Sequence, residues 1–472
     1  MQLRQIGRRR ENDMFAEQLD RIRRKLGEAA AADAENTVFG ARVHKYRLHE
    51  PLRREELERF EKTHGIRLPE EYAAFLTEIG NGGAGPYYGI HPLGARQSIE
   101  LDGIGLPSPL RPQSPVEASE KGAHEGMDEE TTGMDEESEC ESEIYHGLLN
   151  IGEQGCSYET MLVVTGGYRG KVVYMNLDHP RPFFTYEDHF LDWYERWLDE
   201  VIAGYESAWF GLRRAGDERV LTELYRSQSS EAVQIEALEG MLKLRAITDE
   251  TADFICSVRA EASENVGHAA LHVLAKFKFG RAEALLREML GSGDAECRLN
   301  AQQLIKWYMP KGDASFNKEL IAMLPSETDE RSFRFITMVL SDSGAEMLPL
   351  LLPFFTHPDK EFRIQALYQA GHSKAKADYL EAFLTALEDV EPRVQHTALQ
   401  ALRGVTDRRL LPAFEKLLQQ HKTNKDDIRS NVKGLLEHFP FTSMEQVERE
   451  LPSSLLQVKG MLKKILDPYR RS

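Results

Sequence analysis

Residues 55–94, EELERFEKTHGIRLPEEYAAFLTEIGNGGAGPYYGIHPLG, set the expected fold of the N-terminal part of the chain. Apolar side chains recur there at three- and four-residue steps, which predicts one helix that ends at Gly65 and a second that ends at Gly80. Pro69 suits the first turn of the second helix, because a missing N–H costs nothing there. A glycine-rich loop, NGGAG at 81–85, comes next. The segment therefore predicts two helices followed by a tight loop.

The residues around this segment predict an α+β domain. Upstream, from Met14, MFAEQLDRIRRKLGEA places its apolar side chains on one helical face. Residues 1–13 are expected to form a flexible tail, and Met14 is itself a plausible initiator. Downstream, β-branched runs between glycine turns predict three short strands, at 148–155, 160–166 and 170–177. With a closing amphipathic helix over 188–202, these elements define an α+β domain with a small antiparallel sheet over residues 14–205.

One segment of this domain differs in composition. Residues 117–143 contain twelve acidic side chains and one basic one, Lys121, so they hold 11 of the 18 net negative charges. The near-duplicate GMDEETTGMDEES marks low complexity. A segment so charged and so poor in large apolar side chains cannot bury a core, and residues 112–143 are therefore predicted to be a disordered acidic insertion. It serves either as a solvated spacer or as a docking segment for a basic protein.

The composition favours a cationic partner. Of the 472 residues, 41% are apolar and 9% aromatic, which allows two or three domains with ordinary cores. The formal charge of −18 disfavours nucleic acid, because proteins that bind polyanions carry basic surfaces. The four cysteines form no CxxC pair, and no run approaches the roughly 18 apolar residues of a membrane span. We therefore expect reduced thiols, a cytoplasmic location and no membrane contact.

From about residue 206 the sequence predicts helices only, with a recurring motif. The clearest copies are at 265–274 and 393–402, and weaker copies begin near Ala232, Arg298, Arg363 and Ile428. The apolar anchors of these copies lie 33, 33, 65, 30 and 34 residues apart, so a degenerate copy is expected near Arg331 or Arg334. Such helix pairs stack into an αα-solenoid with a long binding face. The array is predicted over residues 206–445, with one capping helix over 446–472.

An Asp-x-x-x-Arg motif recurs within the array. Its three copies join Asp294 with Arg298, Asp359 with Arg363, and Asp389 with Arg393. The pattern resembles short HEAT-like repeats, also found in bilin lyases, over about residues 217–445. The resemblance implies that these residues form a structural ladder between repeats, with contact to a ligand as the alternative.

Several sequence features of the N-terminal domain occur together in one known family of proteins. They are the helix before Gly65, Leu68-Pro69, Tyr72, Phe75-Leu76, Asn81-Gly82-Gly83, the strands of 148–177 and the closing helix WYERWLDEV. With these marks the domain resembles the SUKH superfamily, which groups a yeast cell-wall-assembly regulator with many bacterial immunity proteins. The resemblance covers nearly all of residues 14–203 except the acidic insertion. It implies a non-catalytic protein that binds other proteins, in many bacteria by neutralising a toxin.

Motifs typical of catalytic, cofactor-binding or metal-binding sites are incomplete or absent. Gly80, Gly82 and Gly85 spell a GxGxxG, but they follow a predicted helix, whereas a dinucleotide fingerprint follows a strand. Neither an HExxH metal motif nor a GxSxG nucleophile elbow occurs. We therefore predict no catalytic residue, no cofactor and no metal.

The candidate partner surface is the glycine-rich loop with Asn81, Gly82, Gly83, Tyr87 and Tyr88. The loop is expected to hold both tyrosines at the surface, where tyrosine offers a large contact area at a small entropic cost. The alternative is that these residues only shape the loop.

The leading prediction is a protein-binding protein of the immunity type, whose partner is a protein such as a basic toxin domain. An acidic protein suits a basic partner, because opposite electrostatic fields speed association. The first alternative is a scaffold or regulator of cell-wall or signalling assemblies. The second is an enzyme built on the repeats, such as a bilin lyase or a HEAT-like DNA glycosylase.

Overall fold

The structure is a computed structural model that describes residues 2–95, 99, 101–112, 143–178, 182–423 and 427–466, with the backbone alone for residues 2–14. The chain divides into two compact units, Met1–Phe277 and Lys278–Ser472. The predicted acidic insertion lies outside the described residues except at its two ends, and Cys140 lies outside them too. The three other cysteines are free thiols.

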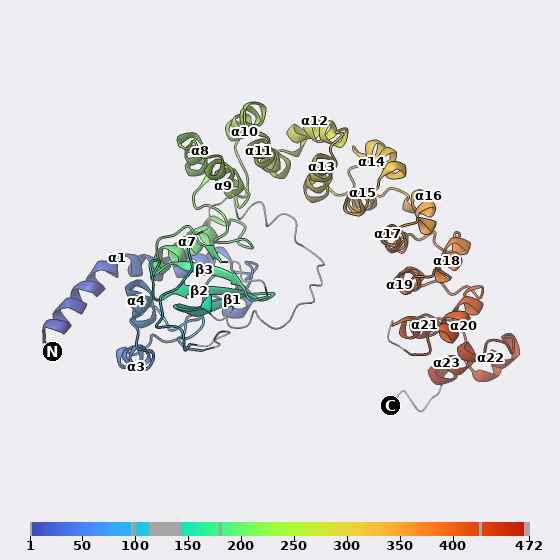
Figure 1. The fold of residues 1–472 in the computed structure, drawn as a ribbon, viewed down its shortest axis with the longest axis horizontal. Coiled ribbons are helices and arrows are strands. Elements are labelled where there is room, and N and C mark those ends of the chain that lie inside the picture. Colours follow the sequence, from blue (N-terminus) through green and yellow to red (C-terminus); the bar gives the residue numbers. More distant parts are fainter. Residues whose placement is uncertain are drawn as a thin grey trace. The chain divides into compact units, whose positions relative to one another are not determined.

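The first unit consists of an α+β domain followed by two helix pairs (Figure 1). Its elements are α1 (Gln2–Ala32), α2 (Ala41–His44), α3 (Arg54–His64), α4 (Glu70–Glu78), β1 (Leu148–Gly155), β2 (Tyr158–Val163), β3 (Val172–Asn176), β4 (Phe183–Phe184), α7 (Phe190–Ala203), α8 (Glu218–Ser227), α9 (Glu231–Met241), α10 (Asp249–Glu261) and α11 (Glu264–Phe277). The sheet is antiparallel with strand order β1-β2-β3-β4. The predicted α+β fold is thus confirmed, whereas β4 and the short α2 were not predicted.

The two predicted helices of the opening segment form where the sequence places their ends. Gly65 closes α3 with φ 66°, a left-handed conformation that glycine adopts without steric cost. The buried Glu61 carboxylate accepts hydrogen bonds from Leu68 N at 3.1 Å and Arg67 Nη1 at 3.0 Å, which fixes the turn into α4. Helix α4 ends at Glu78, two residues before the predicted glycine, and Ile79 is its C-cap.

Aromatic side chains dominate the core of the α+β domain. Phe190, Trp193, Tyr194 and Trp197 of α7 are each at most 1% exposed. One face of the sheet packs into this core, and the alternate residues of the strands form a smaller cluster on the other face, as the two-residue period of a strand requires. The two tryptophans of α7 are therefore core residues.

Helix α1 is longer than predicted. It spans Gln2–Ala32, so its backbone includes residues 2–13, for which the sequence predicted a flexible tail. That segment contains four Arg, two Gln, one Leu and one Glu, all good helix formers, and helix α1 continues through it.

The second unit is entirely helical in its described part. Its elements are α12 (Phe279–Leu290), α13 (Ala295–Tyr308), α14 (Asn317–Met323), η1 (Leu324–Ser326), α15 (Glu330–Asp342), α16 (Met347–Leu351), η2 (Leu352–Thr356), α17 (Lys360–Ala370), α18 (Leu380–Leu387), α19 (Pro392–Ala401), α20 (Leu410–Gln420), α21 (Ile428–Leu436), α22 (Met444–Glu450) and α23 (Leu456–Leu466). Figure 1 shows α13, α15, α17, α19 and α21 along the inner side of this unit's curve, and we call them the inner helices. We call α12, α14, α16, α18 and α20 the outer helices.

The predicted repeats fall on alternate helices. Copies near Arg298, Arg363 and Ile428 lie on inner helices of the second unit, and the degenerate copy near Arg331 is α15. The C-terminal cap contains two helices, α22 and α23, where the sequence predicted one over 446–472. The buried Glu415 carboxylate of α20 accepts hydrogen bonds from the backbone N of Gln457 and Val458 at the start of α23, so the cap is tied to the array.

Candidate functional site

Three of the predicted partner residues shape the glycine-rich loop. Gly82 and Gly83 have φ of 87° and 107°, and a Cβ at Gly83 would lie 2.5 Å from the carbonyl oxygen of Arg47. The half-buried Asn81 accepts a hydrogen bond from Leu93 N at 2.8 Å through Oδ1. These positions therefore have clear structural roles, and their role in partner binding stays a prediction.

The two loop tyrosines lie in different environments. Tyr87 is 7% exposed and its hydroxyl donates to the Phe210 carbonyl at 2.8 Å, so the expectation that both tyrosines lie at the surface is wrong for Tyr87. Burial raises the pKa of Tyr87 far above its usual value. Tyr88 is 36% exposed, and its ring centroid lies 5.4 Å from that of Phe39. Tyr88 is therefore the member of the predicted set that offers an aromatic surface to a partner.

Phe39 lines a recess in the first unit, and two other exposed aromatic residues adjoin the lining, Tyr88 through its ring contact with Phe39 and Trp209 as the chain neighbour of Ala208. Phe39 is 44% exposed and Trp209 is 54% exposed. Trp209 directly follows Ala208, which lines the recess together with Phe39. The recess has a volume of about 320 Å³ and is lined by Ala32, Asp33, Thr37, Val38, Phe39, Val201, Gly204, Tyr205, Glu206, Ser207, Ala208 and Arg245. We call Phe39, Tyr88, Trp209 and this recess the aromatic cleft.

Polar groups of the cleft are satisfied within the protein. The Asp33 carboxylate accepts hydrogen bonds from Thr37 N at 2.7 Å and from the Tyr46 hydroxyl at 2.8 Å. Burial by itself raises the pKa of Asp33, but these hydrogen bonds outweigh it and hold the pKa below its usual value. Arg245 Nε donates to the Gly204 carbonyl at 2.7 Å. The cleft therefore offers shape and an aromatic rim rather than a reactive group.

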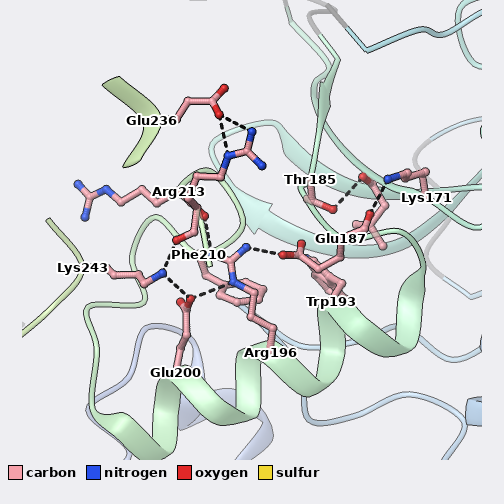
Figure 2. Close-up of polar contacts among 12 residues, drawn as sticks. Lys171, Thr185, Glu187, Trp193, Arg196, Glu200, Phe210, Arg213, Glu236 and Lys243 are labelled. Carbon is pink, nitrogen blue, oxygen red and sulfur yellow. Dashed lines mark hydrogen bonds and ion pairs between the residues drawn. The ribbon is translucent and has the colours of Figure 1, made fainter. Parts of the chain in front are cut away.

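A buried network of two acidic and two basic side chains holds the loop that carries Trp209 (Figure 2). Arg196 of α7 donates to Glu187 at 2.6 Å and to Glu200 at 2.9 Å, and Lys243 Nζ lies 3.0 Å from Glu200 Oε1. The four side chains are at most 8% exposed. Arg196 and Lys243 also donate to the backbone carbonyls of residues 213–214. The network thus joins the α+β domain, the loop after α7 and the end of α9.

Balanced charge makes this network stable in spite of its burial. Burial lowers the pKa of Lys243, and the Glu200 carboxylate opposes that shift. Burial also disfavours the charged form of Arg196, but Glu200 and Glu187 outweigh it and raise the pKa. Removing one partner of a buried ion pair typically costs about 3–5 kcal/mol, because a charge is left without a counter-ion. The network therefore fixes the position of the loop between α7 and α8.

Two of the predicted ladder residues pair across successive repeats. Arg363 Nε lies 2.8 Å from Asp389 Oδ2, and both side chains are about nine-tenths buried. Arg393 pairs across repeats as well, but with Glu361 at 3.5 Å, and its side chain is 71% exposed. The inter-repeat ladder is therefore formed in part, with one partner other than the predicted one.

The remaining ladder residues act within their own repeat. Asp294 and Asp359 cap α13 and α17, accepting hydrogen bonds from backbone N–H groups at 2.7 and 2.8 Å. Arg298 donates to the carbonyl six residues before it at 3.0 Å. In α19 the capping position is held by Glu391, so Asp389 lies two residues ahead of the position that Asp359 holds in α17. The third copy of the sequence motif is consequently out of register with the other copies.

The structure offers no assembled metal site in the part of the chain that it describes, since no group of three or more His, Cys, Asp or Glu side chains could hold an ion there. The GxGxxG glycines lie in the loop after α4, away from any strand-to-helix turn. Each described helix is too short or too polar to span a bilayer.

These features define a class of protein: an α+β domain with an aromatic cleft, followed by an array of helical repeats. Residues 51–196 match the SMI1/KNR4 family (SUKH-1), and residues 348–433 match HEAT repeats. The chain thus contains a SUKH-1 domain and HEAT repeats, which confirms both resemblances. The SUKH match begins after α2, so Phe39 of the cleft lies ahead of it.

Solved structures with similar helices are distant. An X-ray structure of the Escherichia coli protein YibA is 17% identical, covers 55% of this chain and 99% of its own, and has a TM-score of 0.35. The complex of CpcE and CpcF of phycocyanin lyase from Nostoc sp. PCC7120 is 16% identical, covers 54% and 96%, and has a TM-score of 0.28. No curated protein matches the chain. Likenesses this weak carry no argument about function.

Proposed function

We propose that this protein binds another protein through the aromatic cleft and neutralises it, as an immunity-type protein acting in the cytoplasm without catalysing a reaction. The observation that carries the proposal is the aromatic cleft itself, in which the side chains of Phe39, Tyr88 and Trp209 are all exposed. Tryptophan and tyrosine are the side chains most often found at binding hot spots. Tyr88 lies within the residues that match SUKH-1, 51–196, and Phe39 and Trp209 flank them, so the cleft combines this domain with its neighbouring segments in a surface suited to protein recognition.

Charge supports a basic partner such as a toxin domain. Residues 1–277, which hold the cleft, contain 50 acidic and 31 basic side chains, whereas residues 278–472 contain 27 and 28. The whole negative charge of the chain therefore belongs to the first unit. An acidic unit attracts a basic partner over several ångströms and raises the association rate, an effect that weakens with salt.

The test is co-expression of the chain with the product of any neighbouring toxin-like gene, scored by growth protection and by the Kd of the purified pair. Trp209→Ala and Tyr88→Ala should each weaken binding about tenfold or more, because truncation of an aromatic hot spot commonly costs about 2 kcal/mol. The matched control is Tyr168→Ala, since Tyr168 is 37% exposed in the β2–β3 connection. An equal loss of affinity in the Tyr168→Ala control, or failure of every candidate toxin to bind, contradicts the proposal.

The scaffold alternative leads to a different outcome in the same strain. Stable cell-wall or signalling partners, recovered with the chain and released by Trp209→Ala in the absence of any toxin gene, would support it. The Trp209 variant therefore tests whether the cleft binds, and the identity of the partner decides between the two roles.

A further inference from the structure

The segment that contains α2 presents a basic surface next to the aromatic cleft. Buried and exposed residues alternate along it. The exposed ones are Arg42, Val43, Lys45 and Arg47, and we call these four residues the α2 surface. Val43 is 65% exposed, which is unusual for an apolar side chain between basic ones. Phe39 of the cleft lies three residues before the first of them, so the two surfaces adjoin.

The glycine-rich loop holds the α2 surface in place. Ala84 N donates a hydrogen bond to the Arg47 carbonyl at 2.8 Å, and His49 N donates to the Gly82 carbonyl at 3.0 Å. The chain around α2 and the loop after α4 therefore form one layer, and the α2 surface is its exposed side.

Two consecutive residues of this segment have left-handed backbone conformations. Lys45 and Tyr46 have φ of 49° and 54°, which costs a non-glycine residue about 1–3 kcal/mol. The buried Tyr46 hydroxyl donates to Asp33 at 2.8 Å, and the Tyr46 ring stacks on Trp197 with the centroids 5.9 Å apart. These contacts hold the turn that separates Lys45 from Arg47. Backbone strain of this kind concentrates at binding sites, which is a first indication of function here.

The cations of the α2 surface have no carboxylate partner. Its three basic side chains form no ion pair and no side-chain hydrogen bond with any other residue that the structure describes. By contrast, ten basic side chains elsewhere in the α+β domain pair with carboxylates, for example Arg21 with Glu195 at 2.8 Å. The three cations are therefore available to an anionic partner.

The two segments that form this layer contain no carboxylate. Residues 36–49 and 79–95 include no Asp or Glu, although 50 of the 277 residues of the first unit are acidic. The nearest acidic residues along the chain, Glu35 and Glu50, lie just outside the first segment. The α2 surface is thus a local basic region of an acidic unit, and its charge favours an anionic partner at this place.

We propose that the α2 surface binds a short acidic segment of a partner protein, with carboxylates on its three basic side chains and an apolar residue on Val43. Nucleic acid or an anionic membrane would extend beyond this surface over the rest of the unit, whose 50 acidic and 31 basic side chains would repel it. A short segment with few charges avoids that repulsion, and its apolar residue accounts for the exposed valine.

This inference goes beyond the function proposed for the aromatic cleft. A partner that is basic overall fits both proposals if the segment that it places beside Phe39 is acidic. The two proposals fail separately, because the α2 surface and Trp209 belong to different segments of the first unit.

The experiment selects displayed random peptides of about 12 residues on the full chain and measures their affinity by fluorescence anisotropy. The selected peptides should be acidic and contain an apolar residue. Arg42→Glu, Lys45→Glu and Arg47→Glu should each weaken binding about three- to tenfold and reduce its salt dependence, because each brings like charges together. Val43→Ala should weaken binding about threefold, since the burial of two methyl groups is lost. All four side chains are exposed, so these variants should fold.

Matched controls lie on other helices of the first unit. Arg59 and Lys62 are exposed on α3, and Val220 is 45% exposed on α8. Arg59→Glu, Lys62→Glu and Val220→Ala should each leave the affinity for the peptides within about twofold. Trp209→Ala should also leave it within about twofold, whereas the same change weakens binding of a toxin in the aromatic cleft.

Four outcomes would overturn the proposal. They are selection of basic peptides or of none, equal losses of affinity in the control variants, a tenfold loss with Trp209→Ala, and tighter binding of a single-stranded oligouridylate or of phosphatidylserine vesicles than of the selected peptides. None of these measurements uses a toxin, so the function proposed for the aromatic cleft is tested independently of them.

Discussion

Replacing Glu200 with glutamine should destabilise the first unit by about 3–5 kcal/mol. The Glu200 carboxylate is shared by Arg196 at 2.9 Å and Lys243 at 3.0 Å, and its side chain is 6% exposed. Without it, Arg196 keeps Glu187, but Lys243 keeps the Arg214 carbonyl and the face of the Tyr205 ring in place of a carboxylate, in a site where its side chain is 2% exposed. The substitution changes the balanced network into one with a net buried positive charge, and that imbalance is the source of the cost.

The assay is urea unfolding followed by tryptophan fluorescence in a Trp307→Phe background. Trp307 is the single tryptophan of residues 278–472, so in that background all tryptophan signal comes from the first unit. A change in stability without a change in cooperativity moves the urea concentration at the unfolding midpoint and leaves the dependence of the unfolding free energy on urea concentration unaltered. The matched control is Glu28→Gln, because the exposed Arg24–Glu28 pair at 3.3 Å should contribute less than about 1 kcal/mol.

A double replacement separates the charge argument from simple loss of packing. Glu200→Leu with Lys243→Met removes both charges and keeps most of the side-chain volume. The double variant should be more stable than the sum of the single changes predicts, with a coupling of about 1–3 kcal/mol. If the two changes lower the stability additively, or if Glu200→Gln lowers it as little as the Glu28→Gln control does, the buried charge network does not stabilise the contact between α7, the loop after it and the end of α9.

Two further predictions concern ion pairs elsewhere. Hydrogen bonds from Arg21 and Lys25 outweigh burial and lower the pKa of Glu195 to about 2. The ionised carboxylate should therefore stabilise the fold above its unfolded pKa of about 4.5, and this contribution should disappear as the pH falls towards 2. In urea unfolding at a series of pH values, Glu195→Gln should make the free energy of unfolding less dependent on pH over that range. In the second unit, Arg363→Ala should lower the free energy of unfolding by about 2–4 kcal/mol and Arg393→Ala by less than about 0.5 kcal/mol, because the first ion pair is buried and the second is exposed. Thermal unfolding measures both values, and equal losses of stability would contradict this ranking.

The sequence was sufficient for features that depend on local periodicity. Helices α3 and α4, the three longer strands and α7 each carry a clear period and a glycine or proline at one end, and each forms close to its predicted position. The repeat array was also predictable, since a buried apolar pattern recurs along it. Residue spacing alone did not place the motif at Asp389 and Arg393. Its spacing matches that of Asp359 and Arg363, but Asp359 caps α17, whereas α19 is capped by Glu391, two residues after Asp389.

Exposure of single side chains could not be predicted from a pattern. Tyr87 and Tyr88 are neighbours in a loop without periodicity, and only the contact of Tyr87 with Phe210, 123 residues away, shows which of them is buried. Trp209 lies in a loop between two predicted domains, and nothing nearby in sequence indicates that it is exposed. Phe39 was missed for the same reason. Residue type gave no signal either, since two of the four tryptophans are core residues of α7 and the other two, Trp209 and Trp307, are exposed.

The buried network and the aromatic cleft are parts of one arrangement. Loop residues 204–217 run between α7 and α8, and they contribute both Trp209 to the rim and the carbonyls of residues 213–214 to the network. A loop that is free in solution would have to be ordered when a partner binds, at a cost of about 1–2 kcal/mol for each fixed residue. Because the network orders this loop before binding, the cleft is preorganised, and preorganisation raises affinity without any added contact. The ordering of this loop by the network therefore supports the recognition role that is proposed for the aromatic cleft.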